Sequence, residues 1–229
     1  QDGVDMAQLV ACAPEKPEVM RKDIEDTIDT FQSDGLKKIV REMLRLTGDK
    51  LEWFPAAQRL HHAERSGLLH HTTSMLNLAR HVVAAYPFLN AELLYAGVIL
   101  HDLCKTTEMI SDETGSVSDY SADGLLIGHL VRGVARIEEA AKNVGVSGEI
   151  VLLLEHMVLS HHSIPEYGSP KAPMFPEAEV LARIDDLDAK MNEMQGILSR
   201  VPEGAFSEKV WSLDRRIYHP KYQEIDGAE

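Results

Sequence analysis

Residues 93–105 read Leu-Leu-Tyr-Ala-Gly-Val-Ile-Leu-His-Asp-Leu-Cys-Lys, an apolar run that ends directly in an imidazole and a carboxylate. The run is apolar enough for a protein core, where burying an unpaired charge costs on the order of several kcal/mol, comparable to the net stability of a domain. His101 and Asp102 therefore need compensation. A divalent cation would supply it, because imidazole nitrogens and carboxylate oxygens are usual ligands of zinc, manganese, iron and nickel.

The two neighbouring residues cannot complete such a site alone. Adjacent side chains on a helix point about 100° apart, so His101 and Asp102 must straddle one ion or bridge two. The remaining ligands must come from other parts of the chain.

Composition indicates a helical protein without a membrane partner. The chain has 229 residues, of which 44% are hydrophobic and 6% aromatic, and no apolar run approaches the roughly 20 residues that cross a bilayer. The first residues lack the order of a signal peptide. Two cysteines, Cys12 and Cys104, are too few for a disulfide framework. We expect a cytoplasmic protein.

The formal net charge of −14 restricts the partners that the surface can hold. It argues against a broad phosphate-binding surface of the kind that grips duplex DNA. A nucleic-acid substrate would have to be held locally, by metal ions and a few cations. Composition leaves open whether the chain forms a homo-oligomer.

Apolar residues recur at helical spacing along most of the chain, which predicts an all-α fold around one core. Asn90 and Ser147 are expected to cap helices, and Pro176 to begin one. Residues 47–62 read as a polar connection, and residues 109–123 as an exposed loop or small hairpin. The predicted helices cover residues 21–46 (two helices, interrupted at 33–35), 67–86, 90–105, 125–143, 147–161 and a stretch from 176.

The same patterns divide the chain into three parts. Residues 1–20, in which Pro14 and Pro17 are expected to break any helix, read as a linker or the remnant of a preceding domain. Residues 21–200 read as the helical domain. Residues 201–229 read as a C-terminal helix or tail that packs on it.

Polar residues at predicted helix ends follow the order H, HD, H, HH, D, with His71, the His101-Asp102 pair, His129, the His161-His162 pair and an acidic cluster at 185–188. This order resembles that of the HD-domain metal-dependent phosphohydrolases. Six further segments resemble the YhaM type of 3′-to-5′ exoribonuclease, also called CMP-binding factor. They are His-His-Ala (61–63), Gly-Leu-Leu-His-His-Thr (67–72), Leu-His-Asp-Leu (100–103), Ser-His-His (160–162), Gly-Ser-Pro-Lys (168–171) and Ile-Asp-Asp-Leu-Asp-Ala-Lys (184–190).

The resemblance covers roughly residues 10–220 and implies an HD-domain helical bundle around a buried metal site. That family usually carries an OB-fold domain ahead of the HD domain, and residues 9–14 look like the junction that would follow it. We therefore expect a fragment or a short member.

The resemblance also implies two divalent ions, with manganese, iron, nickel, zinc and magnesium as candidates. Asp102 would bridge them. The first ion would be held by His71, His101, Asp102 and Asp185, and the second by His129, His161 and His162 together with Asp102.

We also expect roles near the metal for four further side chains and for a neighbouring serine. Lys105, one helical turn after the HD pair, would contact a substrate phosphate and assist catalysis, and Lys171 would meet a phosphate together with Ser169. His62 would line the cleft or cap a loop. Asp188 would hold a ligand histidine or pair with a cation.

Two positions depart from the family pattern. Cys104 stands where glycine is common, and we interpret it as a packing residue. His70 stands where glutamate is common, and we interpret it as an exposed neighbour of the site.

Two divalent ions can clamp a phosphodiester and lower the pKa of a bridging water. The resemblance thus implies a 3′-to-5′ exoribonuclease acting on single-stranded RNA through a metal-bound hydroxide. A nucleotidase or cyclic-nucleotide phosphodiesterase is the main alternative, favoured by the acidic composition. An oxygen-dependent di-iron enzyme is another, and an inactive regulatory binding module is a third, against which the complete ligand set counts.

Overall fold

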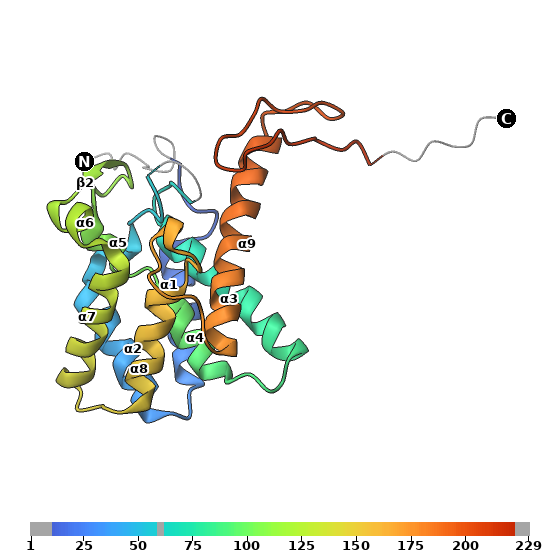
Figure 1. Ribbon diagram of the computed structural model, residues 1–229. Coiled ribbons are helices and arrows are strands. Elements are labelled where there is room, and N and C mark those ends of the chain that lie inside the picture. Colours follow the sequence, from blue (N-terminus) through green and yellow to red (C-terminus); the bar gives the residue numbers. More distant parts are fainter. Residues whose placement is uncertain (1–10, 59–61, 223–229) are drawn as a thin grey trace.

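A computed structural model describes residues 11–58 and 62–222 of the chain (Figure 1), and its helices assemble into a bundle with one small hairpin at its edge. The all-α prediction is confirmed. The α-helices are α1 (Pro17–Asp29), α2 (Asp34–Thr47), α3 (Gly67–Ala85), α4 (Ala91–Leu100), α5 (Lys105–Glu108), α6 (Ala122–Leu126), α7 (Gly128–Asn143), α8 (Glu149–Ser160) and α9 (Pro176–Leu198). Two 3₁₀ turns, η2 (Gly48–Glu52) and η3 (Pro165–Tyr167), and the antiparallel strands β1 (Met109–Ser111) and β2 (Val117–Tyr120) complete the described elements.

Helix α4 is the centre of the bundle. It packs against α2, α3, α8 and α9, and seven of its ten residues are buried. Its start is fixed by Asn90, whose side chain accepts a hydrogen bond from the Leu93 amide at 3.1 Å, as the sequence predicts. A helix this apolar is stable only with neighbours on all sides, which α4 has.

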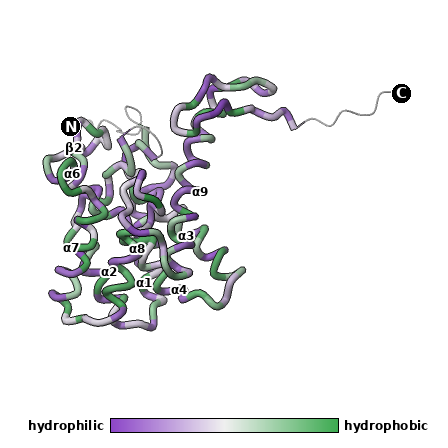
Figure 2. The backbone as a smooth tube through the Cα atoms, in the orientation of Figure 1, coloured by the Kyte–Doolittle hydropathy of each residue, from purple (hydrophilic) through white to green (hydrophobic). Residues whose placement is uncertain are grey.

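The outer helices of the bundle turn amphipathic faces toward the core. Figure 2 shows hydrophobic and hydrophilic residues alternating along α7, and its buried positions include Leu130, Ile137 and Ala140. Helix α7 pairs with α8, and α3 pairs with α9. No helix among the described residues has both the length and the apolar composition needed to cross a bilayer.

Several predicted helix ends are wrong. The chain leaves the helix at Leu100 and makes a tight turn over residues 101–104 before α5. Ser147 does not cap α8: Gly148, with φ of +97°, holds that position without a side-chain cap. The predicted helix over 125–143 is divided at Gly128, where φ is +78°.

The two connecting stretches near the N-terminus also differ from expectation. Pro17 is the first residue of α1, where its missing amide has no helical partner to lose. The 47–62 connection contains η2, and Leu51 and Phe54 within it are buried. The small hairpin expected within residues 109–123 is present.

Helix α9 extends beyond the other helices, and residues 199–222 lead away from the bundle (Figure 1). They contain turns and two isolated bridges, Phe206 to Tyr218 and Val210 to Arg215. The division of the chain into parts at residues 20 and 200 remains a prediction.

Candidate metal centre

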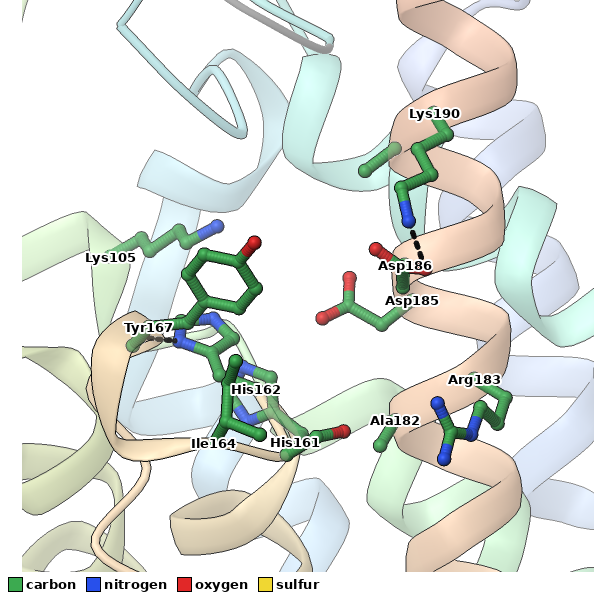
Figure 3. A pocket seen from close by; sticks show the side chains of 12 residues that line it. Lys105, His161, His162, Ile164, Tyr167, Ala182, Arg183, Asp185, Asp186 and Lys190 are labelled. Atoms are coloured by element: carbon green, nitrogen blue, oxygen red, sulfur yellow. Dashed lines mark hydrogen bonds and ion pairs between the residues drawn. The ribbon is translucent and has the colours of Figure 1, made fainter. Parts of the chain in front are cut away.

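The histidines and aspartates predicted to bind metal lie together at one end of the bundle, where the ends of α3, α4, α7 and α8 come together. His71 lies in the first turns of α3, and His129 is the second residue of α7. His101 follows α4 directly, and His161 follows α8 directly. The middle of α9 passes these four ends with Asp185 on its inner side (Figure 3).

Each of five histidine rings has an oxygen close to its Nδ1 atom, through a hydrogen bond in four rings and through an ion-pair contact in His129. An acceptor oxygen lies 2.6 to 2.8 Å from Nδ1 in every case. An Nδ1–H that donates to this acceptor leaves the lone pair on Nε2, which is the tautomer that a metal ion requires. The ring and acceptor pairs are His71 with Asp188, His101 with the Val98 carbonyl, His129 with Glu108, His161 with the Val158 carbonyl and His162 with the Tyr167 carbonyl.

The first group of donors surrounds one oxygen of Asp102. Nε2 of His101 lies 3.3 Å from Oδ2 of Asp102 and 3.3 Å from Nε2 of His71. Oδ1 of Asp185 lies 3.2 Å from Nε2 of His71 and 4.0 Å from Nε2 of His101. Three of these four separations match the edges of a coordination polyhedron with bonds of about 2.0–2.2 Å, which are roughly 3 to 3.5 Å long.

The second group surrounds the other oxygen of Asp102. Nε2 of His129 lies 3.4 Å and Nε2 of His161 lies 3.6 Å from Oδ1 of Asp102. A donor atom of His162 lies within 4.8 Å of these atoms. Asp102 therefore stands between two sets of donors and presents one oxygen to each.

The unsatisfied polar atoms test whether these residues fit metal ions. Oδ1 of Asp102, Nε2 of His161 and both ring nitrogens of His129 are buried and have no hydrogen-bond partner among the described residues. Leaving a buried polar atom without a partner costs about 1–3 kcal/mol. Three of these atoms, Oδ1 of Asp102 and Nε2 of His129 and His161, face one another. A cation at their centre would account for them, so the donor set fits divalent metal ions.

Electrostatics keep the carboxylates charged. Burial would raise the pKa of Asp102, but Lys105 and His101 hold it well below its usual range. Nζ of Lys105 lies 2.7 Å from Oδ2 of Asp102. The pKa of Asp185 is lowered in the same way, against burial, by its contacts with His71 and His101.

The pKa values of His71 and His161 are shifted in opposite directions. Burial would lower the pKa of His71, yet hydrogen bonds to Asp185 and Asp188 raise it to about 9. Burial lowers the pKa of His161 to about 3, and contact with Asp102 offsets this only in part. Without a cation His71 is therefore protonated at neutral pH, whereas His161 is neutral.

Two carboxylates lie next to the Nδ1 atoms of His71 and His129. Oδ2 of Asp188 lies 2.7 Å from Nδ1 of His71, and its Oδ1 accepts a hydrogen bond from Ser74. Asp188 therefore contacts His71, while its role behind a metal ligand stays a prediction. Glu108, which the sequence did not single out, lies 2.8 Å from Nδ1 of His129. Its position at the end of a one-turn helix gives no distinctive signal.

A cavity of about 460 Å³ opens beside the donors, between α9 and the loop after α8. Figure 3 shows Lys105, His162, Tyr167 and Asp185 around it. Tyr167 is 70% exposed. Sequence reasoning missed Tyr167, because one aromatic residue in a Pro-rich and Gly-rich loop carries no distinctive pattern.

The other expected substrate contacts lie elsewhere. Ser169 is fully buried, and its hydroxyl accepts a hydrogen bond from the His162 amide at 3.1 Å, so it fixes the turn that carries the two histidines. Lys171 is exposed and is not among the residues lining the 460 Å³ cavity. His62 is buried, and its Nε2 lies 2.8 Å from Oδ2 of Asp188. His61 lies outside the described residues.

The structure also shows where Cys104 and His70, the two departures from the family pattern, lie. Cys104 is 5% exposed, and no donor group found among the described residues includes it, which agrees with a packing role. His70 is partly buried and contacts Glu64 and His62.

The HD domain model matches residues 68–190 of the chain. The chain is 43% identical over 226 residues to the 3′-5′ exoribonuclease YhaM of Geobacillus sp. (strain WCH70), covering 98% of this chain and 68% of that protein. It is 40% identical over 225 residues to the 3′-5′ exoribonuclease YhaM of Halalkalibacterium halodurans (97% and 69%). It is 42% identical over 224 residues to that of Listeria monocytogenes (97% and 70%). A search of the solved structures gave no match.

Proposed function

Because the chain belongs to the HD-domain family, we propose that it is a metal-dependent phosphohydrolase that removes nucleotides from the 3′ end of single-stranded RNA. The observation that carries the proposal is the convergence of four Nε2 atoms, and of a donor atom of His162, on the carboxylates of Asp102 and Asp185. The relatives named for 3′-5′ exoribonuclease activity align over nearly the whole chain.

The two donor groups would hold two divalent ions. His71, His101 and Asp185 would bind the first together with Oδ2 of Asp102, and His129, His161 and His162 the second together with Oδ1. When bound, such ions polarise a phosphate oxygen and lower the pKa of a water molecule, which supplies the nucleophile for phosphodiester hydrolysis. Manganese, iron, nickel and zinc suit this mixture of imidazole and carboxylate, and magnesium is the least suited to it.

The side chains of the protein would hold the metal-binding atoms in place and position the substrate phosphate. The Nδ1 anchors prevent the rings from turning away, so little reorganisation is needed when substrate arrives. Lys105 lies between Asp102 and the cavity, where its ammonium group can pass from the carboxylate to a phosphate oxygen. There it offsets the negative charge that accumulates on the phosphate during hydrolysis.

The cavity suits the terminal nucleotide of a strand. Its volume of about 460 Å³ lies within the range of small-ligand sites, roughly 300–1,000 Å³. The exposed ring of Tyr167 offers a surface on which a base of any identity can stack. Recognition by stacking and by phosphate contact agrees with hydrolysis that depends little on sequence.

A paired substitution tests the proposal. His71→Gln removes a donor, whereas His81→Gln changes an exposed histidine on the same helix. With manganese and 5′-labelled single-stranded RNA, wild type and His81→Gln should produce a ladder of shortened labelled products, and His71→Gln should lose at least a hundredfold in rate. Equal rates in the two variants would contradict the proposal.

The same cavity would also admit a free mononucleotide, so a nucleotidase or cyclic-nucleotide phosphodiesterase is the second candidate. Release of phosphate from nucleoside monophosphates, or opening of cyclic nucleotides, without shortening of RNA would select it. Exclusion of duplex DNA, a cytoplasmic location and the oligomeric state remain predictions to be tested on the purified protein.

A further inference from the structure

One group of metal-ligating side chains lies outside the centre described above. It consists of His62, Glu64 and His70, from the connection that precedes α3 and from the start of α3 itself. We propose that these three side chains form an additional binding site for one divalent cation of the borderline class to which zinc belongs.

The spacing of the donor atoms suits a single ion. Nδ1 of His70 lies 3.1 Å from Nδ1 of His62 and 2.8 Å from Oε1 of Glu64. Nδ1 of His62 lies 3.9 Å from the same carboxylate oxygen. A tetrahedral site with bonds of about 2.0–2.2 Å has edges of roughly 3.3–3.5 Å, a length that the three separations bracket.

Nδ1 of His62 lies 3.1 Å from Nδ1 of His70 and 3.4 Å from the side-chain amide nitrogen of Asn192. Nε2 of His62 lies 2.8 Å from Oδ2 of the buried Asp188, so its N–H donates there and the lone pair of a neutral ring is on Nδ1. Nδ1 of His70 then faces two acceptors, the His62 nitrogen and the Glu64 oxygen, with at most one proton to give. A cation would accept lone pairs from all three donors at once.

His62 is oriented in the manner of a metal ligand. A carboxylate behind a histidine fixes the tautomer and raises the basicity of the nitrogen that faces the metal. Asp188 has this relation to His62 and, through the same oxygen, to His71 in the main centre. His62 also has a φ of +46° and donates its backbone amide to the Asn192 side chain at 2.9 Å, so its position is held by several interactions.

An ion could reach the cluster from solvent. The side chains of His70 and Glu64 are 24% and 21% exposed, whereas His62 is 3% exposed. His70 also borders a surface cavity of about 530 Å³, whose lining includes Glu15 and an ion pair between Asp23 and Arg80. Three protein donors and one open side would leave the last coordination position to water.

Counting ions bound by metal-free protein on equilibrium dialysis against zinc tests this site. His70→Gln should bind one ion fewer per chain than wild type, and His81→Gln should match wild type. Cobalt titration gives a second readout, since His70→Gln should lose part of the visible absorption of the cobalt-loaded protein. Equal ion counts in wild type and His70→Gln would overturn the proposal and leave an ordinary ion pair between His70 and Glu64.

Two further measurements keep the outcome interpretable. Glu64→Gln should show the same loss of one ion, which covers the case in which His70→Gln does not fold. RNA trimming with manganese, measured on the same preparations, should persist in His70→Gln because the donors around Asp102 are intact. Absence of trimming in wild type would refute the proposed function while leaving the difference in ion count as evidence for this site.

Discussion

At the scale of single residues, the order of histidines and aspartates in the sequence predicted which side chains lie together in the candidate metal centre. His71, His101, Asp102 and Asp185 lie together as one group, and His129, His161 and His162 reach the other oxygen of Asp102. Their assignment as metal ligands remains a prediction. Glu108 and Tyr167 could not be found from sequence, because their positions depend on how loops fold back on the bundle.

Metal binding should release a proton, and pH should control this release. The pKa of His71 is about 9 without a cation, so the ring is protonated at pH 7 and must lose its proton to become a ligand. His161, with a pKa of about 3, is already neutral and releases none. We expect release of about one proton from His71 at pH 7, fading as pH rises through 9.

Calorimetric titration of metal-free protein in buffers of different ionisation enthalpy measures this release. His71→Gln provides the comparison and should release about one proton fewer at pH 7. If the variant and wild type release equal numbers of protons, His71 is not the titrating ligand.

Cys104 should be unreactive in the native protein. Burial raises the pKa of its thiol to about 11, so at pH 8 only about a thousandth of it is thiolate. In a Cys12→Ser background, alkylation by iodoacetamide should therefore become fast only after denaturant is added. Rapid labelling of the native protein would show that Cys104 is exposed and would contradict its packing role.

At the scale of elements, hydrophobic periodicity located the helices, and its errors fall at their ends. The ends depend on tertiary contacts or on a single backbone angle, such as the positive φ of Gly128 and Gly148. The turn over residues 101–104 is one such end. It terminates α4 just before His101 and Asp102, the two residues at the middle of the candidate centre. Local sequence gave no signal for that break.

Two capping substitutions test the corrected helix starts. Asn90→Ala should lower the free energy of unfolding by about 1 kcal/mol, because the Asn90 side chain caps α4. Ser147→Ala should change it by less than about 0.5 kcal/mol, because Gly148 holds the capping position of α8. Urea denaturation measures both, and a larger loss for Ser147→Ala than for Asn90→Ala would be inconsistent with this structure.

Gly67, the first residue of α3, permits a close approach that positions His62. A Cβ atom at Gly67 would lie 1.9 Å from the carbonyl oxygen of His62, a backbone atom that cannot move alone. Gly67→Ala should destabilise the protein by about 2 kcal/mol or more. Gly196→Ala in α9, where nothing lies within 4 Å, should stabilise it by about 0.5–1 kcal/mol. Thermal unfolding of the two variants should shift in opposite directions, and a neutral Gly67→Ala would argue against the close approach.

At the scale of the whole molecule, the sequence predicted one helical core and an acidic protein with local substrate contacts. The positive residues that line the cavity are Lys105, Arg183 and Lys190, and the last two already pair with Glu179 and Asp186. The arrangement of residues 199–222 was not predictable, because they form neither a periodic helix nor an extended sheet.

This charge distribution predicts a weak dependence of RNA binding on salt. With one to three phosphate contacts, the logarithm of the affinity should fall with the logarithm of salt concentration with a slope of about −0.7 to −2. Fluorescence anisotropy with labelled single-stranded RNA, at constant metal concentration, measures the slope. A slope steeper than about −4 would reveal a separate basic surface and contradict local binding.

The central claim is that the donors around Asp102 hold the metal that hydrolyses RNA. Its most direct test is a manganese titration of metal-free protein in which trimming of 5′-labelled single-stranded RNA is followed for wild type and Asp102→Asn. We predict that wild type shortens the RNA from its 3′ end only as manganese is added, and that Asp102→Asn remains inactive at every concentration. Trimming by metal-free wild type, or by Asp102→Asn at the wild-type rate, would contradict the claim.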